Sequence, residues 1–370
     1  MRAPLDPGSR YRIRTKLACT VILVGFSVGI NEIYDGSRAF RDWYGMTGYP
    51  FLSRIQRILT GWCPFSLGDI LYIFAGVGLL FYLVRLGKAL WRKRGKAVFR
   101  LSLDGVNGLL LIYLVFICIW GLNYRSFRTE KDFRVYPQQY SVSELSQLGA
   151  WLLENTNRYH RMVDGSAEDT TALHLLPEEV FAGARQAYLA SEASQPGMVY
   201  RHPSVKPSMF GYLMNFIGVS GYYNPFTGEA QVNTAIPQLL QPYVCCHEMA
   251  HQLGFAPEES ANFVGYVAAM HSNNPVFRYS ANFDLMLYAL GELRFRDSVA
   301  EKALWATLDT GVKKDYGIIR TFYRQFSNPV DPLMSRMYDR FLRANHETEG
   351  IYSYDEVIGL LIQYYRKIPR

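Results

Sequence analysis

The sequence predicts an α+β protein in which three N-terminal transmembrane helices precede a mostly helical domain with a small antiparallel β-sheet. Three observations predict this architecture: three long apolar runs in the first third, helical spacing of apolar residues in most of the remainder, and one aromatic- and glycine-rich stretch patterned as two strands around a turn. The 370 residues suffice for one large domain or two modest ones. We expect a membrane domain, residues 1–124, and one outer domain, residues 125–370.

The three apolar runs lie near residues 17–34, 67–84 and 105–122. A membrane-spanning helix needs about 20 mostly apolar residues, and the second and third runs provide them. The first run is shorter, and its alternative interpretation is a cleaved signal peptide, but no convincing small-residue cleavage site follows it. The alternative for the other two runs is that they form buried core helices. Residues 85–100, which lie between these runs, include basic residues and no acidic ones, which favours membrane helices.

The positive charge of the chain is concentrated beside these runs. The net charge is +7, whereas residues 1–16 carry +4 and residues 85–100 carry +7, so the remainder is negative. This distribution follows the positive-inside rule and differs from the basic groove that nucleic-acid phosphates require. We therefore expect the lipid bilayer, and no nucleic acid, as a partner. The predicted protein spans the cell (plasma) membrane several times, with a cytoplasmic N-terminus and everything after Tyr124 outside the cytoplasm.

Local signals organise the outer domain. The Ser-Val-Ser-Glu sequence at residues 141–144 is a capping box that opens a helix, and Pro177 suits the first turn of a second helix. Residues 209–233 are rich in aromatic residues, valine and glycine, and Asn-Pro-Phe-Thr-Gly-Glu within them is typical of a turn between two strands. Helical patterns return near Tyr243, so the sheet is expected to be small.

One motif carries catalytic potential, the His-Glu-x-x-His sequence at residues 247–251. On a helix, His247 and His251 project from one face a single turn apart, so that both imidazoles can reach one metal ion. Glu248 follows the first histidine directly and would lie beside the metal as a general base. The alternative is a helix that happens to carry two histidines, since this short pattern also arises by chance.

A catalytic zinc site commonly has three protein ligands, so a third ligand is needed. Gly254 fits the end of the motif helix, and Pro257 permits a second helix to start after a reversal of the chain. That reversal brings Glu258 and Glu259 back toward the histidines, and the residues alone leave both open as ligands. His271 is a remote third option at the other end of the second helix.

These motifs resemble the bacterial membrane family called domain of unknown function 3810, which is grouped with zincin-like metallopeptidases. The resemblance covers most of the chain and includes the three N-terminal helices. Its sequence motifs are PFSLGDIL at residues 64–71, WGLNYR at 120–125, GYYNPFTGEAQVN at 221–233, CHEMAHQLGFAPEESANF at 246–263 and YSYDEVIGLLI at 352–362. The resemblance implies a zincin-like fold for the outer domain.

The ligand pattern also resembles that of gluzincins, whose third ligand is a glutamate on a following helix, often in Glu-x-x-Ala-Asp. Residues 258–262 read Glu-Glu-Ser-Ala-Asn, and this register selects Glu258 over Glu259. Asn262 stands where many gluzincins have aspartate, so the carboxylate that would orient a ligand histidine is not supplied there.

Together these expectations describe a zinc-dependent metallopeptidase that hydrolyses peptide bonds with a zinc-bound water activated by Glu248, while His247, His251 and Glu258 hold Zn²⁺. The expected substrate is a peptide or protein outside the cytoplasm. The alternatives are a non-catalytic membrane scaffold or sensor, an intramembrane protease, and a hydrolase of a non-peptide bond. Tyr279 and Tyr223 are candidates for stabilising the oxyanion, although packing is the commoner role of a tyrosine.

Overall fold

The computed structural model describes residues 7–136, 138–328, 336, 340 and 353–367. Its internal contacts divide the chain into two units. The first consists of Met1–Leu52 and Leu67–Leu122, and the second consists of Ser53–Ser66 and Asn123–Arg370. The sequence analysis assigned residues 53–66 to the membrane domain, whereas the structure packs them with the second unit.

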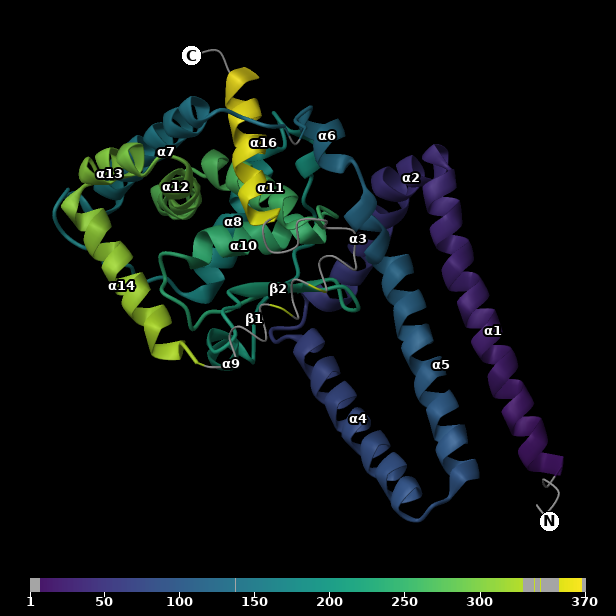
Figure 1. The fold of residues 1–370 in the computed structure, drawn as a ribbon. Helices are drawn as coiled ribbons and strands as arrows, with labels where there is room; N and C mark the ends of the chain where they lie inside the picture. The colour runs from purple at the N-terminus through teal and green to yellow at the C-terminus, as the bar shows by residue number, and fades with distance from the viewer. Residues whose placement is uncertain (1–6, 137, 329–335, 337–339, 341–352, 368–370) are drawn as a thin grey trace. The chain divides into compact units, whose positions relative to one another are not determined.

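The first unit contains three helices that are long and apolar enough to cross a membrane, α1 (Pro7–Gly36), α4 (Leu67–Trp91) and α5 (Gly95–Ile119) (Figure 1). Asn107, the polar interruption of the third apolar run, links α5 to α1, because its Oδ1 lies 2.7 Å from Thr20 Oγ1 and its Nδ2 donates to Lys16 O at 3.1 Å. Lipid tails are as apolar as these helices, so burial of apolar surface gives the helices little reason to associate. Hydrogen bonds such as these help to hold them together.

Two details of the first unit differ from the sequence-based expectation. The basic residues 85–100 are mostly helical, because α4 continues to Trp91 and α5 already begins at Gly95. A short turn with Lys93 at a positive φ of 50° joins the two helices. At its other end α5 stops at Ile119 rather than residue 122, and the 3₁₀ helix η2 (Gly121–Arg125) follows. Between α1 and α4 the chain forms α2 (Arg38–Trp43), the π-helix η1 (Tyr44–Gly48) and α3 (Tyr49–Gly61).

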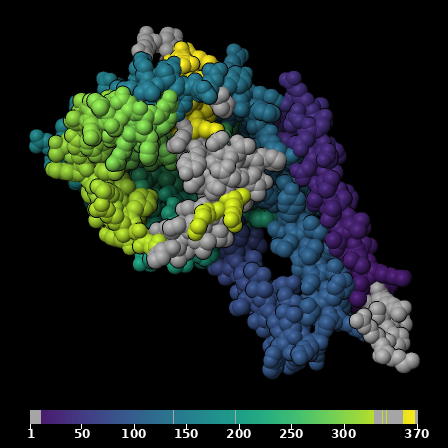
Figure 2. Space-filling view, viewed as in Figure 1, coloured from purple at the N-terminus to yellow at the C-terminus, as the bar shows by residue number. Residues whose placement is uncertain are grey.

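The second unit is mostly helical, as predicted. The expected capping box opens α7, where Ser141 Oγ accepts from the Glu144 N–H at 3.2 Å and Glu144 Oε2 accepts from the Ser141 N–H at 2.9 Å. The long helices α7 and α12 pack together, while α10 and α11 pack against each other in the interior of this unit. In Figure 2 the helices α13 and α14 form one flank of its surface. Its helices are α6 (Arg128–Phe133), α7 (Val142–Asp164), α8 (Pro177–Ser191), η3 (Pro196–Met198), α9 (Gly211–Asn215), α10 (Gln241–Gln252), α11 (Glu258–His271), α12 (Pro275–Arg296), α13 (Ser298–Ala306), α14 (Thr310–Phe326) and α16 (Ser353–Lys367).

The small sheet has three strands, β1 (Val205–Pro207), β2 (Gly221–Asn224) and β3 (Glu229–Val232), in the order β1-β3-β2. The predicted strand-turn-strand segment is confirmed, because β2 and β3 form an antiparallel hairpin. The prediction of a wholly antiparallel sheet is wrong, since β1 pairs with β3 in parallel. The intervening residues 208–220, which include α9, carry the chain from the end of β1 back to the start of β2.

The segment of residues 53–66 is tied to the second unit by hydrogen bonds. Ser53 Oγ donates to Gln252 O at 2.6 Å, and Thr60 Oγ1 lies 2.7 Å from Ser204 Oγ. Gln56 Nε2 donates to Pro225 O, in the turn of the hairpin, at 2.7 Å. Part of α3 therefore supports both the C-terminal end of α10 and the sheet beside it.

Candidate metal centre

The helices α10 and α11 are joined by the reversal that the sequence predicts. Gly254 has a φ of 96°, a left-handed conformation that suits glycine at a helix end. The chain then extends through Pro257, and Glu258 begins α11. The C-terminal carbonyls of α10 are satisfied from outside the helix, because Arg128 donates to Leu253 O and Ser53 donates to Gln252 O. These bonds fix the end of the reversal that leaves α10.

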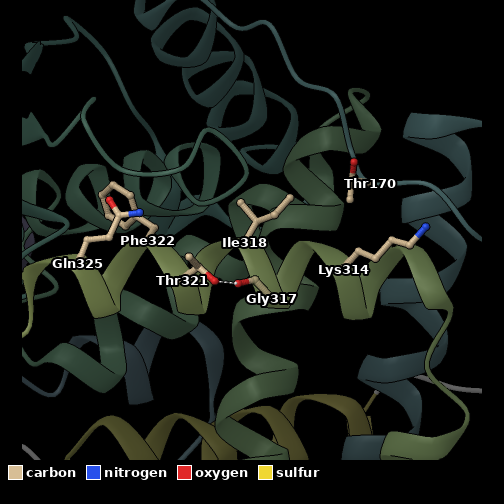
Figure 3. A pocket seen from close by; sticks show the side chains of 7 residues that line it. All are labelled: Thr170, Lys314, Gly317, Ile318, Thr321, Phe322 and Gln325. Atoms are coloured by element: carbon tan, nitrogen blue, oxygen red, sulfur yellow. Dashed lines mark hydrogen bonds between the residues drawn. The ribbon is translucent and has the colours of Figure 1, made fainter.

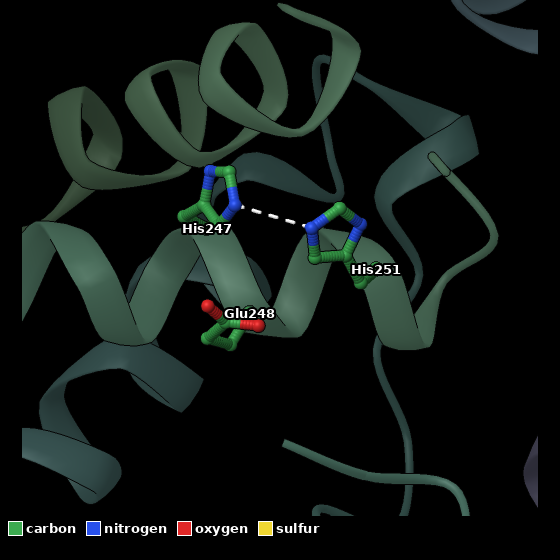
Figure 4. A group of neighbouring side chains, drawn as sticks. All are labelled: His247, Glu248 and His251. Carbon is green, nitrogen blue, oxygen red and sulfur yellow. Dashed lines mark hydrogen bonds between the residues drawn. The ribbon is translucent and has the colours of Figure 1, made fainter. Parts of the chain in front are cut away.

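Two imidazoles and one carboxylate meet beside this reversal. His247 Nε2 lies 3.1 Å from His251 Nε2, and Glu258 Oε2 lies 3.3 Å from the former nitrogen and 3.9 Å from the latter. His247 and His251 rise from the same side of α10 in Figure 4, as the spacing of four residues predicts. His251 and Glu258 are buried, and the side chain of His247 is 13% exposed.

Glu248 completes the cluster from a different direction. One of its carboxylate oxygens lies within 4.8 Å of ring nitrogens of both histidines, and Figure 4 shows it leaving the opposite side of α10. Glu258, with its Oε2 at 3.3 and 3.9 Å from the two ring nitrogens, is the candidate for a third ligand, and Glu248 lies beside it. Glu248 Oε2 is buried and has no hydrogen-bond partner among the described residues, as expected of a group that meets water or a ligand there.

His251 is oriented by its other ring nitrogen. Its Nδ1 lies 2.8 Å from the carbonyl oxygen of Phe255, so that a proton on Nδ1 leaves the Nε2 lone pair facing the cluster. Asn262 lies near His247 and contributes to the rise of its pKa. Asn262 is at the position where gluzincins carry aspartate, with an amide in place of a carboxylate.

Two glycines allow close packing around these side chains. A Cβ on Gly265 of α11 would lie 2.9 Å from the backbone nitrogen of His247, so a side chain there would separate α10 from α11. A Cβ on Gly221 of β2 would lie 2.6 Å from Glu248 Oε1. Glycine at these two positions lets α11 and the sheet approach the cluster from opposite sides of α10.

The charges in the cluster shift the pKa values of its members. Burial lowers the pKa of His247, but its hydrogen bond with Glu258 and attraction to both carboxylates outweigh burial and raise it to about 9. Burial and the neighbouring charge of His247 lower the pKa of His251 to about 4. Burial, opposed by His247, raises the pKa of Glu248 to about 8. Attraction to the carboxylates thus dominates at His247, whereas burial and the charge of His247 dominate at His251.

Asp284 of α12 lies near enough to His247 for electrostatic attraction, which lowers the pKa of Asp284. Burial has the larger effect and raises this pKa to about 6. On the same face of α12, Ser280 Oγ accepts from the N–H of Tyr243, one helical turn before His247. The sequence analysis did not identify Asp284. Its only local signal is an acidic residue between apolar neighbours in Asn-Phe-Asp-Leu-Met, which gives no direction toward α10.

The other sequence candidates lie in different surroundings. His271, at the far end of α11, contacts Ser194 Oγ through Nε2 at 3.0 Å and Val267 O through Nδ1 at 2.8 Å. Tyr279 is buried and donates to Asp315 Oδ2 at 2.7 Å, so its hydroxyl is already used. Tyr223 is closer to the cluster, with its ring centroid 6.5 Å from that of His251. Glu259 is partly buried in the first turn of α11, directly after Glu258.

A separate open hollow of about 690 Å³ lies along α14 (Figure 3). Its lining consists of Thr170 and one face of α14, namely Lys314, Gly317, Ile318, Thr321, Phe322 and Gln325. None of these residues belongs to the cluster of α10 and α11, and the hollow offers no group of metal ligands. The candidate site is therefore the cluster of α10 and α11, and the hollow is no part of it.

A family model described as "Protein of unknown function (DUF3810)" matches residues 44–362. The matched region begins after α1 and includes α4, α5, the sheet and the whole cluster. The comparisons give no match among curated proteins and none among solved structures. The matched region covers most of the chain and agrees with the resemblance seen in the sequence. The chain therefore belongs to the DUF3810 family, a family of proteins of unknown function.

Proposed function

We propose that this chain is a membrane-anchored, zinc-dependent metallopeptidase with a zincin-like outer domain and its active site outside the cytoplasm. The observation that carries the proposal is the convergence of the donor atoms of His247, His251 and Glu258, which are 3.1, 3.3 and 3.9 Å apart. Bonds of about 2.0–2.2 Å in a tetrahedral zinc site place neighbouring donor atoms about 3.3–3.6 Å apart. Shifts of a few tenths of an ångström would bring the present separations to that geometry.

The composition of the cluster also fits zinc. Two neutral imidazole nitrogens with one carboxylate oxygen are a ligand set typical of catalytic zinc sites, which keep one position open. The buried and unpartnered Oε2 of Glu248 lies next to this set. When bound, Zn²⁺ supplies Lewis acidity, making water acidic near neutral pH and polarising a peptide carbonyl.

The residues of the chain supply the remaining steps. Glu248, whose buried and unpartnered Oε2 lies next to the ligand set, can accept a proton from water and release it to a leaving amine. The carbonyl of Phe255 holds His251 in a fixed orientation, and Asn262 lies near His247. Tyr223 lies on the same face of β2 as Gly221, the face that reaches Glu248.

The sheet offers a place for an extended substrate. β2 is an edge strand of the described sheet, and its first residue, Gly221, lies against Glu248. A peptide that added to this edge would hydrogen-bond through its backbone and pass beside the cluster. This arrangement supports a peptide substrate over a small hydrolysable molecule, which has no use for a strand edge.

Cleavage of a peptide library by the full-length chain in detergent tests this proposal. Glu248→Gln should retain zinc and reduce cleavage by about 10²–10⁴-fold, the usual contribution of a general base. The matched control is Glu154→Gln, on the exposed face of α7, which should leave cleavage unchanged. A zinc-loaded wild-type chain that cleaves nothing would favour the alternative, a non-catalytic scaffold or sensor. Cleavage that persists in Glu248→Gln would remove Glu248 from the mechanism.

A further inference from the structure

The part of α3 that belongs to the second unit has its polar side chains buried. Ser53, Arg57 and Thr60 recur at intervals of four and three residues, so they lie on one face of the helix. Their exposed fractions are 0%, 4% and 7%. An amphipathic helix of a globular protein normally buries its apolar face, so the orientation of α3 is the reverse of the usual one.

The opposite face of this segment is apolar and exposed. Ile55, Ile58 and Leu59 lie on the helix, and Trp62 and Phe65 continue the surface in the turn that follows. Their exposed fractions are 39%, 47%, 63%, 77% and 49%, in that order. Single exposed apolar residues are common on proteins, whereas five within eleven residues form a patch that marks an interaction surface. We call these five residues the α3 apolar face.

The buried contacts prevent α3 from rotating to hide this face. Ser53 Oγ donates to the carbonyl of Gln252, and Thr60 Oγ1 contacts Ser204 Oγ. The guanidinium of Arg57 lies over the Tyr200 ring, 5.0 Å from its centroid. Turning the apolar face inward would break all three of these contacts, so the exposed orientation belongs to the folded unit.

The position of this face in the chain indicates what covers it. Only five residues lie between Gly61, the end of α3, and Leu67, the start of an apolar helix long enough to cross a membrane. The six residue steps from Gly61 to Leu67 span at most about 20 Å when fully extended, so the α3 apolar face cannot lie far from the point where α4 would enter the bilayer. Tryptophan and phenylalanine beside a membrane helix are typical of the interfacial zone, and the exposed Arg54 can reach lipid phosphates from the same helix.

We propose that the α3 apolar face lies in the outer interface of the lipid bilayer and seats the second unit on the membrane surface. The proposal rests on the proposed membrane anchoring and adds a contact that the spanning helices do not make. It also bears on the candidate site, because Ser53 on the other side of α3 bonds the carbonyl of Gln252, the residue after His251. The C-terminal end of α10 is thereby held next to the helix that contacts lipid.

Quenching of tryptophan fluorescence by brominated lipid tests this proposal on the full-length chain. The protein is reconstituted in phosphatidylcholine vesicles with and without bromine on the acyl carbons nearest the headgroup, and the quenched fraction of the total emission is measured. Trp62→Phe removes one of six tryptophans and keeps an aromatic ring in place. Trp305→Phe is the matched control, since Trp305 lies on α13 and packs on Tyr316 with ring centroids 5.1 Å apart.

The two variants should change the quenched fraction in opposite directions. Removing a strongly quenched Trp62 lowers the fraction, whereas removing an unquenched Trp305 raises it. A fraction that rises or stays constant in Trp62→Phe would overturn the proposal and indicate that protein, rather than lipid, covers the face. The measurement needs neither zinc nor peptide cleavage, so its outcome is independent of the proposed enzymatic activity. Zinc content measured on the same samples identifies a failure of the metal site separately.

Discussion

The contact of Gly265 with α10 gives a quantitative test of how the cluster is positioned. A Cβ at residue 265 would lie 2.9 Å from the nitrogen and 3.0 Å from the Cα of His247, and both are backbone atoms that cannot rotate away. Relieving the overlap to ordinary contact requires α10 and α11 to separate locally by about 0.5 Å, since the Cβ of a packed residue rarely approaches other atoms closer than 3.4 Å. Because Glu258 lies on α11, the same movement displaces one proposed ligand from the others.

Gly265→Ala should therefore destabilise the protein and weaken zinc binding together. Overpacking of this kind costs about 1–3 kcal/mol, which lowers the apparent melting temperature of a unit of this size by roughly 2–10 °C. Metal sites tolerate distance errors of about 0.2 Å, so a 0.5 Å displacement is expected to reduce zinc affinity by about tenfold or more, tenfold being about 1.4 kcal/mol. Thermal unfolding and competition with a chromogenic chelator measure the two effects on the detergent-solubilised full chain.

Gly291→Ala is the matched control. Gly291 lies within α12, and no atom lies within 4 Å of the position of its Cβ. Alanine is favoured over glycine in a helix by about 0.5–1 kcal/mol, so this variant should be neutral or slightly stabilised with unchanged zinc affinity. If the Gly265→Ala and Gly291→Ala variants behave alike in both assays, the close approach of α11 to His247 does not position the cluster.

Three further variants test separate parts of the account. Asn262→Leu should reduce zinc affinity by about 10–100-fold in a chelator competition, because it replaces the polar side chain beside His247, a proposed ligand, with an apolar one; unchanged affinity would refute a role for Asn262. Gly221→Ala should suppress peptide cleavage while zinc content is retained, since its Cβ would meet Glu248 Oε1 at 2.6 Å, and full activity would count against that contact. The Ser141 N–H and other contacts lower the pKa of Glu144 to about 2, so its stabilising effect is present above about pH 4.5 and disappears as the pH falls toward 2. Glu144→Gln should flatten the melting temperature of the protein over that interval, and an unaltered profile would show that the capping box contributes nothing there.

Much of this fold follows from local patterns in the sequence. Hydrophobic length and basic flanks predict the three N-terminal helices, and the capping box at Ser141 fixes the start of α7. The reversal between α10 and α11 is also local, because Gly254 and Pro257 act within a few residues of the motif. For this reason the sequence alone was enough to predict that Glu258, rather than the distant His271, lies near the two histidines.

The features that the sequence did not predict depend on non-local contacts. Three-residue β1 carries too little pattern to reveal its parallel pairing with β3. The placement of residues 53–66 is hidden for a different reason, since the apolar side of α3 is exposed and its polar side is buried. Asp284 approaches His247 only because α12 packs on α10. In each case the determining contact joins segments that are far apart in the chain.

The most direct test of the central claim is the zinc content of the purified full-length chain, measured by inductively coupled plasma mass spectrometry. We expect about one zinc per chain in the wild type and in Glu259→Ala, and its loss in His247→Ala, His251→Ala and Glu258→Ala. Circular dichroism of each variant would show that the helical fold is retained. A folded wild-type chain without zinc, or a Glu258→Ala variant that keeps it, would contradict the assignment of these three residues as a metal site.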